Sequence, residues 1–166
     1  MGTSLVTFGK WLEESPAGLM VRESLWGFQI VVAIHIVSLA FSVGLLVWFD
    51  LRLLGLGVRP SRVSEVYRQL IRWAGFGFVS MFVTGGLLFT GFATSAIGNV
   101  FFRAKLLLIA AAGANALLYH LVTEHGAPVW DEDERPPAAA RLAGLVSIVV
   151  WTLVVLCGRM MSYTMF

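Results

Sequence analysis

The chain has 166 residues, of which 58% are hydrophobic and only 13% are charged. A soluble domain carries about 25% charged residues, and the mean hydropathy here is +0.81, so the composition excludes a water-soluble globular domain and indicates a protein whose partner is the lipid bilayer. The formal net charge is +2, and Lys and Arg form no stripe, so we predict no nucleic-acid partner.

The N-terminal segment, residues 1–23, is predicted to lie at the membrane interface. Four apolar residues recur in it at helical spacing: Leu5, Phe8, Trp11 and Leu12. Charged residues lie opposite them, as in helices that rest in the headgroup plane. Ser15 followed by Pro16 predicts the cap and first turn of a second short helix. An ordinary arm before the first membrane helix is the alternative, and the features of a secretory signal are missing.

Four apolar segments follow, and each is close to the 20 or so residues that cross a bilayer. They cover residues 25–48, 73–93, 101–122 and 141–164. The sequence therefore predicts an all-α fold, an integral membrane four-helix bundle with an N-terminal interfacial segment. The whole chain, residues 1–166, forms one transmembrane domain.

Lys and Arg are divided unequally between the two ends of this bundle. One end carries the basic residues of the first and third connections: Arg52, Arg59, Arg62, Arg68, Arg72, Arg135 and Arg141. The other end carries fewer: Lys10, Arg22, Arg103, Lys105 and Arg159. Because basic loops stay in the cytoplasm, we predict a multi-pass protein of the bacterial cytoplasmic (inner) membrane with both termini in the periplasm.

His35 is the most informative polar residue within a predicted span. It lies about ten residues into the first span, which is about 15 Å along a helix axis and near the bilayer centre. Ser38 and Ser42 share its helical face, so this stripe is predicted to face the bundle interior. An ionisable residue inside a membrane is expensive and marks a functional candidate. A histidine hydrogen-bonded to a serine or a carbonyl of another helix is the alternative.

His120, near the end of the third span, suggests a use for His35. The helical face of His120 also carries Gly113 and Ala116, which leave room for a flat ligand. Histidines on facing membrane helices hold b-type haem through the iron. We therefore predict that haem b, one or two molecules, is bound by His35 and His120. The expected role is redox chemistry or electron transfer with a redox partner in the membrane.

Three basic residues near the periplasmic end are candidate partners for the haem propionates: Arg103, Lys105 and Arg159. Snorkelling of these side chains toward lipid headgroups is the alternative. His120 lies about 10 Å nearer the cytoplasmic face than His35 by the rise of a helix. A sixth ligand from Met81 or Met160, or two separate haem sites, therefore remain alternatives to one bis-histidine haem.

A second interpretation uses the histidines for metal ions. His35 and His120 are the candidate ligands, and His120 lies close to Glu124 and His125 along one helix end, a set that suits zinc or copper. Metal or small-solute transport, or a structural membrane subunit, are therefore alternative functions. The acidic run 131–134 is predicted to be a solvated loop. Glycine and alanine runs exceed what one small bundle needs, which is compatible with a homo-oligomer.

Several stretches resemble a widespread group of bacterial four-helix membrane proteins of unknown activity. They are residues 25–35, 49–56, 102–106, 115–120 and 158–159. The resemblance extends over nearly the whole chain and implies the architecture. It implies no activity.

A more distant resemblance is to the four-helix membrane protoporphyrinogen oxidase that binds haem b. It rests on these residues: His35, Gly44-Leu45, Arg52-Leu53, Lys105-Leu106 and Tyr119-His120. The resemblance implies haem binding. The Asn-Glu-Pro of that family is absent before the last helix, where residues 141–144 read Arg-Leu-Ala-Gly, and Arg159 matches its C-terminal lysine only loosely. These departures leave the oxidase reaction without support. A distant likeness to a copper-resistance membrane protein favours the metal interpretation.

Overall fold

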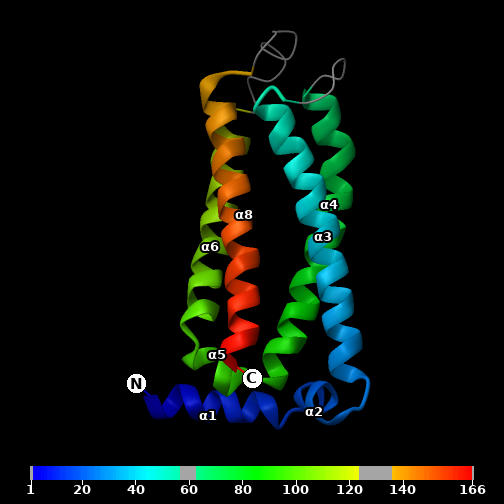
Figure 1. Ribbon diagram of the computed structural model, residues 1–166, viewed down its shortest axis with the longest axis vertical. Helices are drawn as coiled ribbons and strands as arrows, with labels where there is room; N and C mark the ends of the chain where they lie inside the picture. The colour runs from blue at the N-terminus through cyan, green and yellow to red at the C-terminus, as the bar shows by residue number, and fades with distance from the viewer. Residues whose placement is uncertain (1, 57–62, 124–135, 166) are drawn as a thin grey trace.

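The computed structural model describes residues 2–56, 63–123 and 136–165 (Figure 1). These residues form helices and no strand: α1 Gly2–Glu13, α2 Pro16–Glu23, α3 Gly27–Leu53, α4 Val63–Gly91, α5 Ala93–Gly98, α6 Val100–Leu118, the π-helical turn η1 Tyr119–Thr123 and α8 Ala138–Met165. Four of them contain a stretch long and apolar enough to cross a membrane: residues 27–53, 68–91, 100–121 and 138–165. The predicted all-α four-helix bundle is confirmed, and the chain is a multi-pass membrane protein.

The bundle is built from two helix pairs. α3 packs along α4, α6 packs along α8, and α3 joins the two pairs through its contact with α8. Figure 1 shows α1 and α2 lying across one end of the bundle, with both chain termini at that end. The end of α3 and the start of α8 lie at the opposite end.

The first membrane helix is longer than the sequence predicts. The predicted span ends at residue 48, before two charged residues, whereas α3 continues to Leu53. Asp50 does not end the helix because its side chain turns into the bundle, where the residue is 3% exposed. The helix stops only at Gly55, whose φ of +80° is a left-handed conformation that glycine adopts without strain.

The N-terminal helices form a cap over one end of the bundle. The predicted start of α2 is confirmed, because Ser15 accepts a hydrogen bond from the Gly18 backbone N–H and Pro16 occupies the first turn. Glu13 ties the cap to α5 by accepting a hydrogen bond of 2.7 Å from the Thr94 backbone N–H. The apolar side chains of Phe8 and Trp11 remain exposed, as expected for a helix that rests in the membrane interface.

Small and polar residues form the seam between α3 and α4. Ser38 Oγ lies 2.7 Å from Ser80 Oγ, and Gly77 has no room for a side chain because Ser42 occupies that space. Ser42 is fully buried. The predicted inward face of Ser38 and Ser42 is therefore confirmed, and its partner is the small-residue face of α4. Small residues let membrane helices approach closely.

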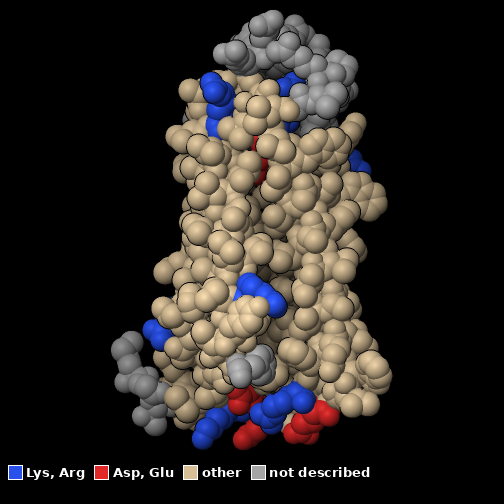
Figure 2. Space-filling view, viewed as in Figure 1, with Lys and Arg blue, Asp and Glu red and all other residues tan. Residues whose placement is uncertain are grey.

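Charged residues gather at the two ends of the molecule. Figure 2 shows Lys, Arg, Asp and Glu there, with a broad uncharged band between that is broken by a basic patch in its lower half. Exposed apolar side chains cover the sides of the helices, Phe76 and Leu107 among them. This distribution matches a bundle whose sides face lipid and whose ends face headgroups and water.

Candidate functional site

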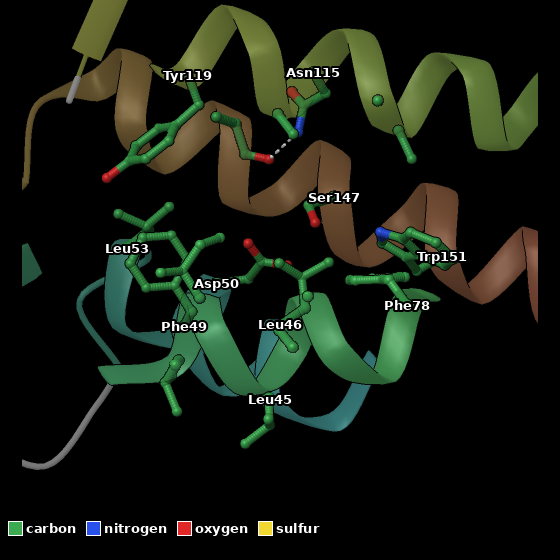
Figure 3. Close-up of a pocket in the computed structure, with 18 of the residues that line it drawn as sticks. Leu45, Leu46, Phe49, Asp50, Leu53, Phe78, Asn115, Tyr119, Ser147 and Trp151 are labelled. Atoms are coloured by element: carbon green, nitrogen blue, oxygen red, sulfur yellow. Dashed lines mark hydrogen bonds between the residues drawn. The ribbon is translucent and has the colours of Figure 1, made fainter. Parts of the chain in front are cut away.

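A cavity of about 340 Å³ lies inside the half of the bundle farther from α1 and α2 (Figure 3). All four membrane helices line it. Its polar lining comes from four residues: Asp50, Asn115, Tyr119 and Ser147. The volume falls within the range of small-molecule sites, about 300–1,000 Å³. The remaining lining is aliphatic, aromatic or glycine, so the cavity combines an apolar body with a few polar groups.

Asp50 is the charged residue of this cavity. Figure 3 shows its carboxyl group directed toward Ser147 on α8. The second carboxyl oxygen, Oδ2, is buried and has no hydrogen-bond partner among the described residues. Burying a carboxylate without a counter-charge is costly. The site therefore holds an acceptor whose partner is missing from the described part of the chain.

Close helix packing fixes the position of Asp50. A side-chain carbon on Gly144 would lie 3.0 Å from the Asp50 carbonyl oxygen and 3.2 Å from Leu53 Cβ. A glycine at position 144 therefore lets α8 lie this close to α3 without displacing either helix. Ser147 lies three residues farther along the same helix face, which places its hydroxyl at Asp50.

Aromatic side chains surround the polar group at both ends of the cavity. Phe49 and Tyr119 meet edge to face, with ring centroids 5.7 Å apart. Phe78 and Trp151 lie 5.1 Å apart at the other end. Asn115 is held by a hydrogen bond of 3.0 Å from its Nδ2 to the Ala143 carbonyl oxygen (Figure 3). The walls are thus rigid aromatic faces around one carboxyl group.

Asp50 was not among the site residues predicted from the sequence, because it looked like a charge flanking the first span. A signal for it does exist. Ser38, Ser42, Leu46 and Asp50 recur every four residues and so follow one ridge of a helix. The stripe that begins at His35 therefore continues to an acidic residue.

His35 lies in the other half of the bundle, on the seam between α3 and α4. Its Nδ1 is 3.0 Å from the Met81 carbonyl oxygen and 3.0 Å from Thr84 Oγ1. A carbonyl can only accept, so Nδ1 carries the proton donated to Met81. The alternative foreseen from the sequence, a histidine bonded to a carbonyl of another helix, is therefore present. The same bond leaves Nε2 without a proton in the neutral ring.

Lys105 lies near this histidine instead of reaching outward. Its Nζ is 3.3 Å from the place where a side chain on Gly158 of α8 would begin. His35 and Gly158 lie at about the same depth, roughly 12 Å and 11 Å from the ends of their helices. The ammonium group therefore points into the bundle.

The remaining predicted residues lie on the outside. His120 is exposed on η1. Arg103 donates to the Gly98 carbonyl oxygen. Arg159 donates to the Tyr163 hydroxyl and stacks over that ring, with 4.7 Å from Cζ to the centroid. All three residues are exposed.

The two histidines do not form one haem site in this arrangement. His35 lies about 12 Å and His120 about 30 Å from the starts of their helices, which are at the same end of the bundle, so they differ in depth by about 18 Å. The ligands of one iron must meet at one point. Met81 presents its carbonyl to His35, and Met160 is exposed. The residues therefore do not fit the predicted bis-histidine haem, and haem binding itself stays a prediction.

The proposed metal set at the end of α6 is described only in part. Glu124, His125 and the acidic run 131–134 lie outside the described residues. Within the described ranges, no three His, Cys, Asp or Glu residues gather closely enough to hold a metal ion. The metal interpretation of His120 therefore stays a prediction.

Comparison with known proteins adds no relative. No protein-family model matches the chain, and neither a curated protein nor a solved structure matches it. The resemblances in short motifs therefore stay predictions. The chemistry of the cavity is the guide to function.

Proposed function

We propose that the cavity around Asp50 binds a small organic molecule with an apolar body and one positively charged amine. This corresponds to the small-solute alternative, binding or transport. The observation that carries it is the buried Asp50 carboxyl, whose Oδ2 has no partner among the described residues and which lies in a cavity of about 340 Å³.

An ammonium group supplies what this carboxyl lacks. Its N–H groups donate to Oδ2 and its charge compensates the carboxylate, and charge-assisted bonds of this kind are roughly twice as strong as neutral ones. The aromatic faces of Trp151 and Tyr119 add cation–π attraction. An anion or a neutral hydrocarbon would leave the carboxyl uncompensated. The electrostatics of the cavity therefore select for a cation.

The position of the cavity suits transport across the cytoplasmic membrane. Asp50 lies three residues before the end of α3, at the end of the bundle opposite α1 and α2, which we propose to be the cytoplasmic end, with both termini periplasmic. A site that is reached from one leaflet and closed toward the other is the starting state of a carrier. The seam of His35, Ser38 and Ser42 lies between this site and the periplasmic end.

A binding measurement tests the proposal. The full-length protein in phosphatidylcholine nanodiscs is titrated with octylammonium by calorimetry, with octanol as the uncharged molecule of equal chain length and empty nanodiscs as the blank. We expect saturable one-site binding of octylammonium that octanol does not reproduce. Equal affinity for both molecules would show an apolar cavity without charge selection and would overturn the proposal.

Filling the cavity is expected to abolish this binding. Gly113 lines the cavity, and a side chain there would meet nothing within 4 Å. Gly113→Leu therefore occupies ligand space without pushing helices apart, and we expect at least tenfold weaker octylammonium binding by calorimetry. The matched control is Gly86→Leu, because Gly86 has equal space but does not line the cavity. Equal weakening by both variants would contradict a site in this cavity.

Haem at His35 is the second candidate, favoured by one observation. The Nδ1 hydrogen bond to the Met81 carbonyl is the arrangement that orients histidine ligands of metals and leaves Nε2 to coordinate. The other axial position would not come from His120. Lys105, which points into the bundle nearby, would supply a cation for a haem propionate.

Absorption spectra decide this candidate. For protein expressed with ample haem and purified in mild detergent, a haem on His35 is expected to give a Soret band that shifts with dithionite. His35→Ala should remove the band, whereas His120→Ala should keep it because that residue is exposed. Aromatic absorbance alone would sink the haem prediction.

A further inference from the structure

The cavity around Asp50 is closed on three sides by packed side chains. Toward the end of α3 it is closed by a cluster of buried residues: Phe49, Leu53, Tyr119 and Ala140. Toward the bundle centre, a second cluster forms the floor: Met81, Ala112, Trp151 and Val154. At the junction of α3 with α8, the contact at Gly144 is tight, because a side-chain carbon there would lie 3.0 Å from the Asp50 carbonyl oxygen.

The fourth side, between α4 and α6, is open. These two helices are not among the pairs that pack extensively in the described structure. Cavity-lining residues on both are exposed: Ile71 and Phe82 on α4, and Gly113 and Ala116 on α6. Ile71 is 47% exposed and Phe82 54%. The lining of the cavity therefore reaches the outer surface of the bundle along this edge.

This opening faces hydrocarbon. Gly113 lies about 20 Å along the membrane-crossing part of α6, and Phe82 about 21 Å along that of α4, by the rise of a helix. Both depths fall within a hydrocarbon core of about 30 Å. At that depth the opening is in contact with acyl chains and not with water. A molecule dissolved among the acyl chains therefore meets the opening directly.

We propose that the ligand is a membrane-dissolved amphiphilic amine that reaches Asp50 sideways from the bilayer, through the gap between α4 and α6. This rests on the proposed function and names its substrate class and its route. The amine reaches the carboxyl at the back of the cavity, against α3 and α8, while its alkyl chain lies along the small residues of α6 and out toward the lipid. Gly75, Gly113 and Ala116 keep that path open because they have little or no side chain.

Association rates test the route. Hexyl-, octyl- and decylammonium are mixed with the full-length protein in phosphatidylcholine vesicles at equal free aqueous concentration. Binding is followed by stopped-flow tryptophan emission, and the signal is assigned to Trp151 if Trp151→Phe loses it while calorimetry still detects octylammonium binding. Each added CH₂ raises membrane partition about fourfold. We expect the on-rate to rise in step with this partition. An on-rate independent of chain length would overturn access from the bilayer.

Variants at the gap between α4 and α6 give a second test through their association and dissociation rates. Ala116→Phe narrows the opening, so we expect several-fold slower association and dissociation with a smaller change in affinity. Ala114→Phe is the matched control, because Ala114 is exposed on the same helix but does not line the cavity. Equal rates in both variants would contradict the gap as the route. Absence of any octylammonium binding that depends on Asp50 would instead defeat the proposed function itself.

Discussion

Asp50→Asn is expected to weaken octylammonium binding by roughly 10- to 100-fold while leaving octanol binding unchanged. The substitution keeps the shape of the side chain and removes the charge. A hydrogen bond to a charged group contributes about 1.5–3 kcal/mol, and about 1.4 kcal/mol corresponds to a factor of ten in affinity. Calorimetric titration of the variant and the wild type in the same nanodiscs measures the difference.

The same substitution is expected to stabilise the protein without ligand. A buried carboxylate whose Oδ2 lacks a partner among the described residues costs desolvation free energy that the uncharged amide of the variant would not incur. We therefore expect a higher Tm for Asp50→Asn in detergent. A lower Tm together with unchanged amine affinity would show that Asp50 serves the packing of α3 against α8 and not ligand binding.

The fold could be predicted from the sequence because lipid imposes a simple rule. A chain crossing hydrocarbon must satisfy its own backbone hydrogen bonds, so long apolar segments become helices. The inward stripe of Ser38 and Ser42 followed from helical spacing alone. Its pairing with Ser80 and Gly77 did not, because spacing gives the face of a helix and not its neighbour. That pairing depends on which glycines permit close approach, as Gly77 does against Ser42.

The site was harder to predict, since a charged side chain near the end of a span can either face outward toward headgroups or turn inward between helices. Arg103 and Arg159 have the expected outward arrangement and remain exposed. Asp50 turns inward, because its short side chain cannot snorkel and Gly144 lets α8 pack over it. Lys105 is long enough to snorkel, yet it turns inward beside Gly158. The direction of such a side chain depends on the neighbouring helix, and the sequence of a single span does not show which helix that is.

The histidines show the same limit. His35 was predicted to face the interior, and its bonds to Met81 and Thr84 confirm this. His120 was grouped with it by residue type. Helix rise alone already predicted a difference in depth, and the exposed position of His120 adds a difference in direction. The shared chemistry of two side chains therefore did not establish a shared site.

Gly144→Ala is expected to lower the Tm and to weaken amine binding together. The added carbon would lie 3.0 Å from the Asp50 carbonyl oxygen, so α8 must move away from α3. Forcing an extra group into a packed contact costs about 1–3 kcal/mol. The movement also carries Ser147 away from the Asp50 carboxyl group that faces it. Thermal unfolding in detergent and calorimetry in nanodiscs measure the two effects.

Gly44→Ala is the matched control and is expected to act in the opposite direction. Gly44 lies in α3, and a side chain there would meet nothing within 4 Å. The alanine gains helix propensity of up to about 1 kcal/mol, so the Tm should stay equal or rise while amine binding is unchanged. If Gly144→Ala instead behaves like Gly44→Ala, the α3–α8 contact is not tight. The positioning of Asp50 by Gly144, on which the site depends, would then be wrong.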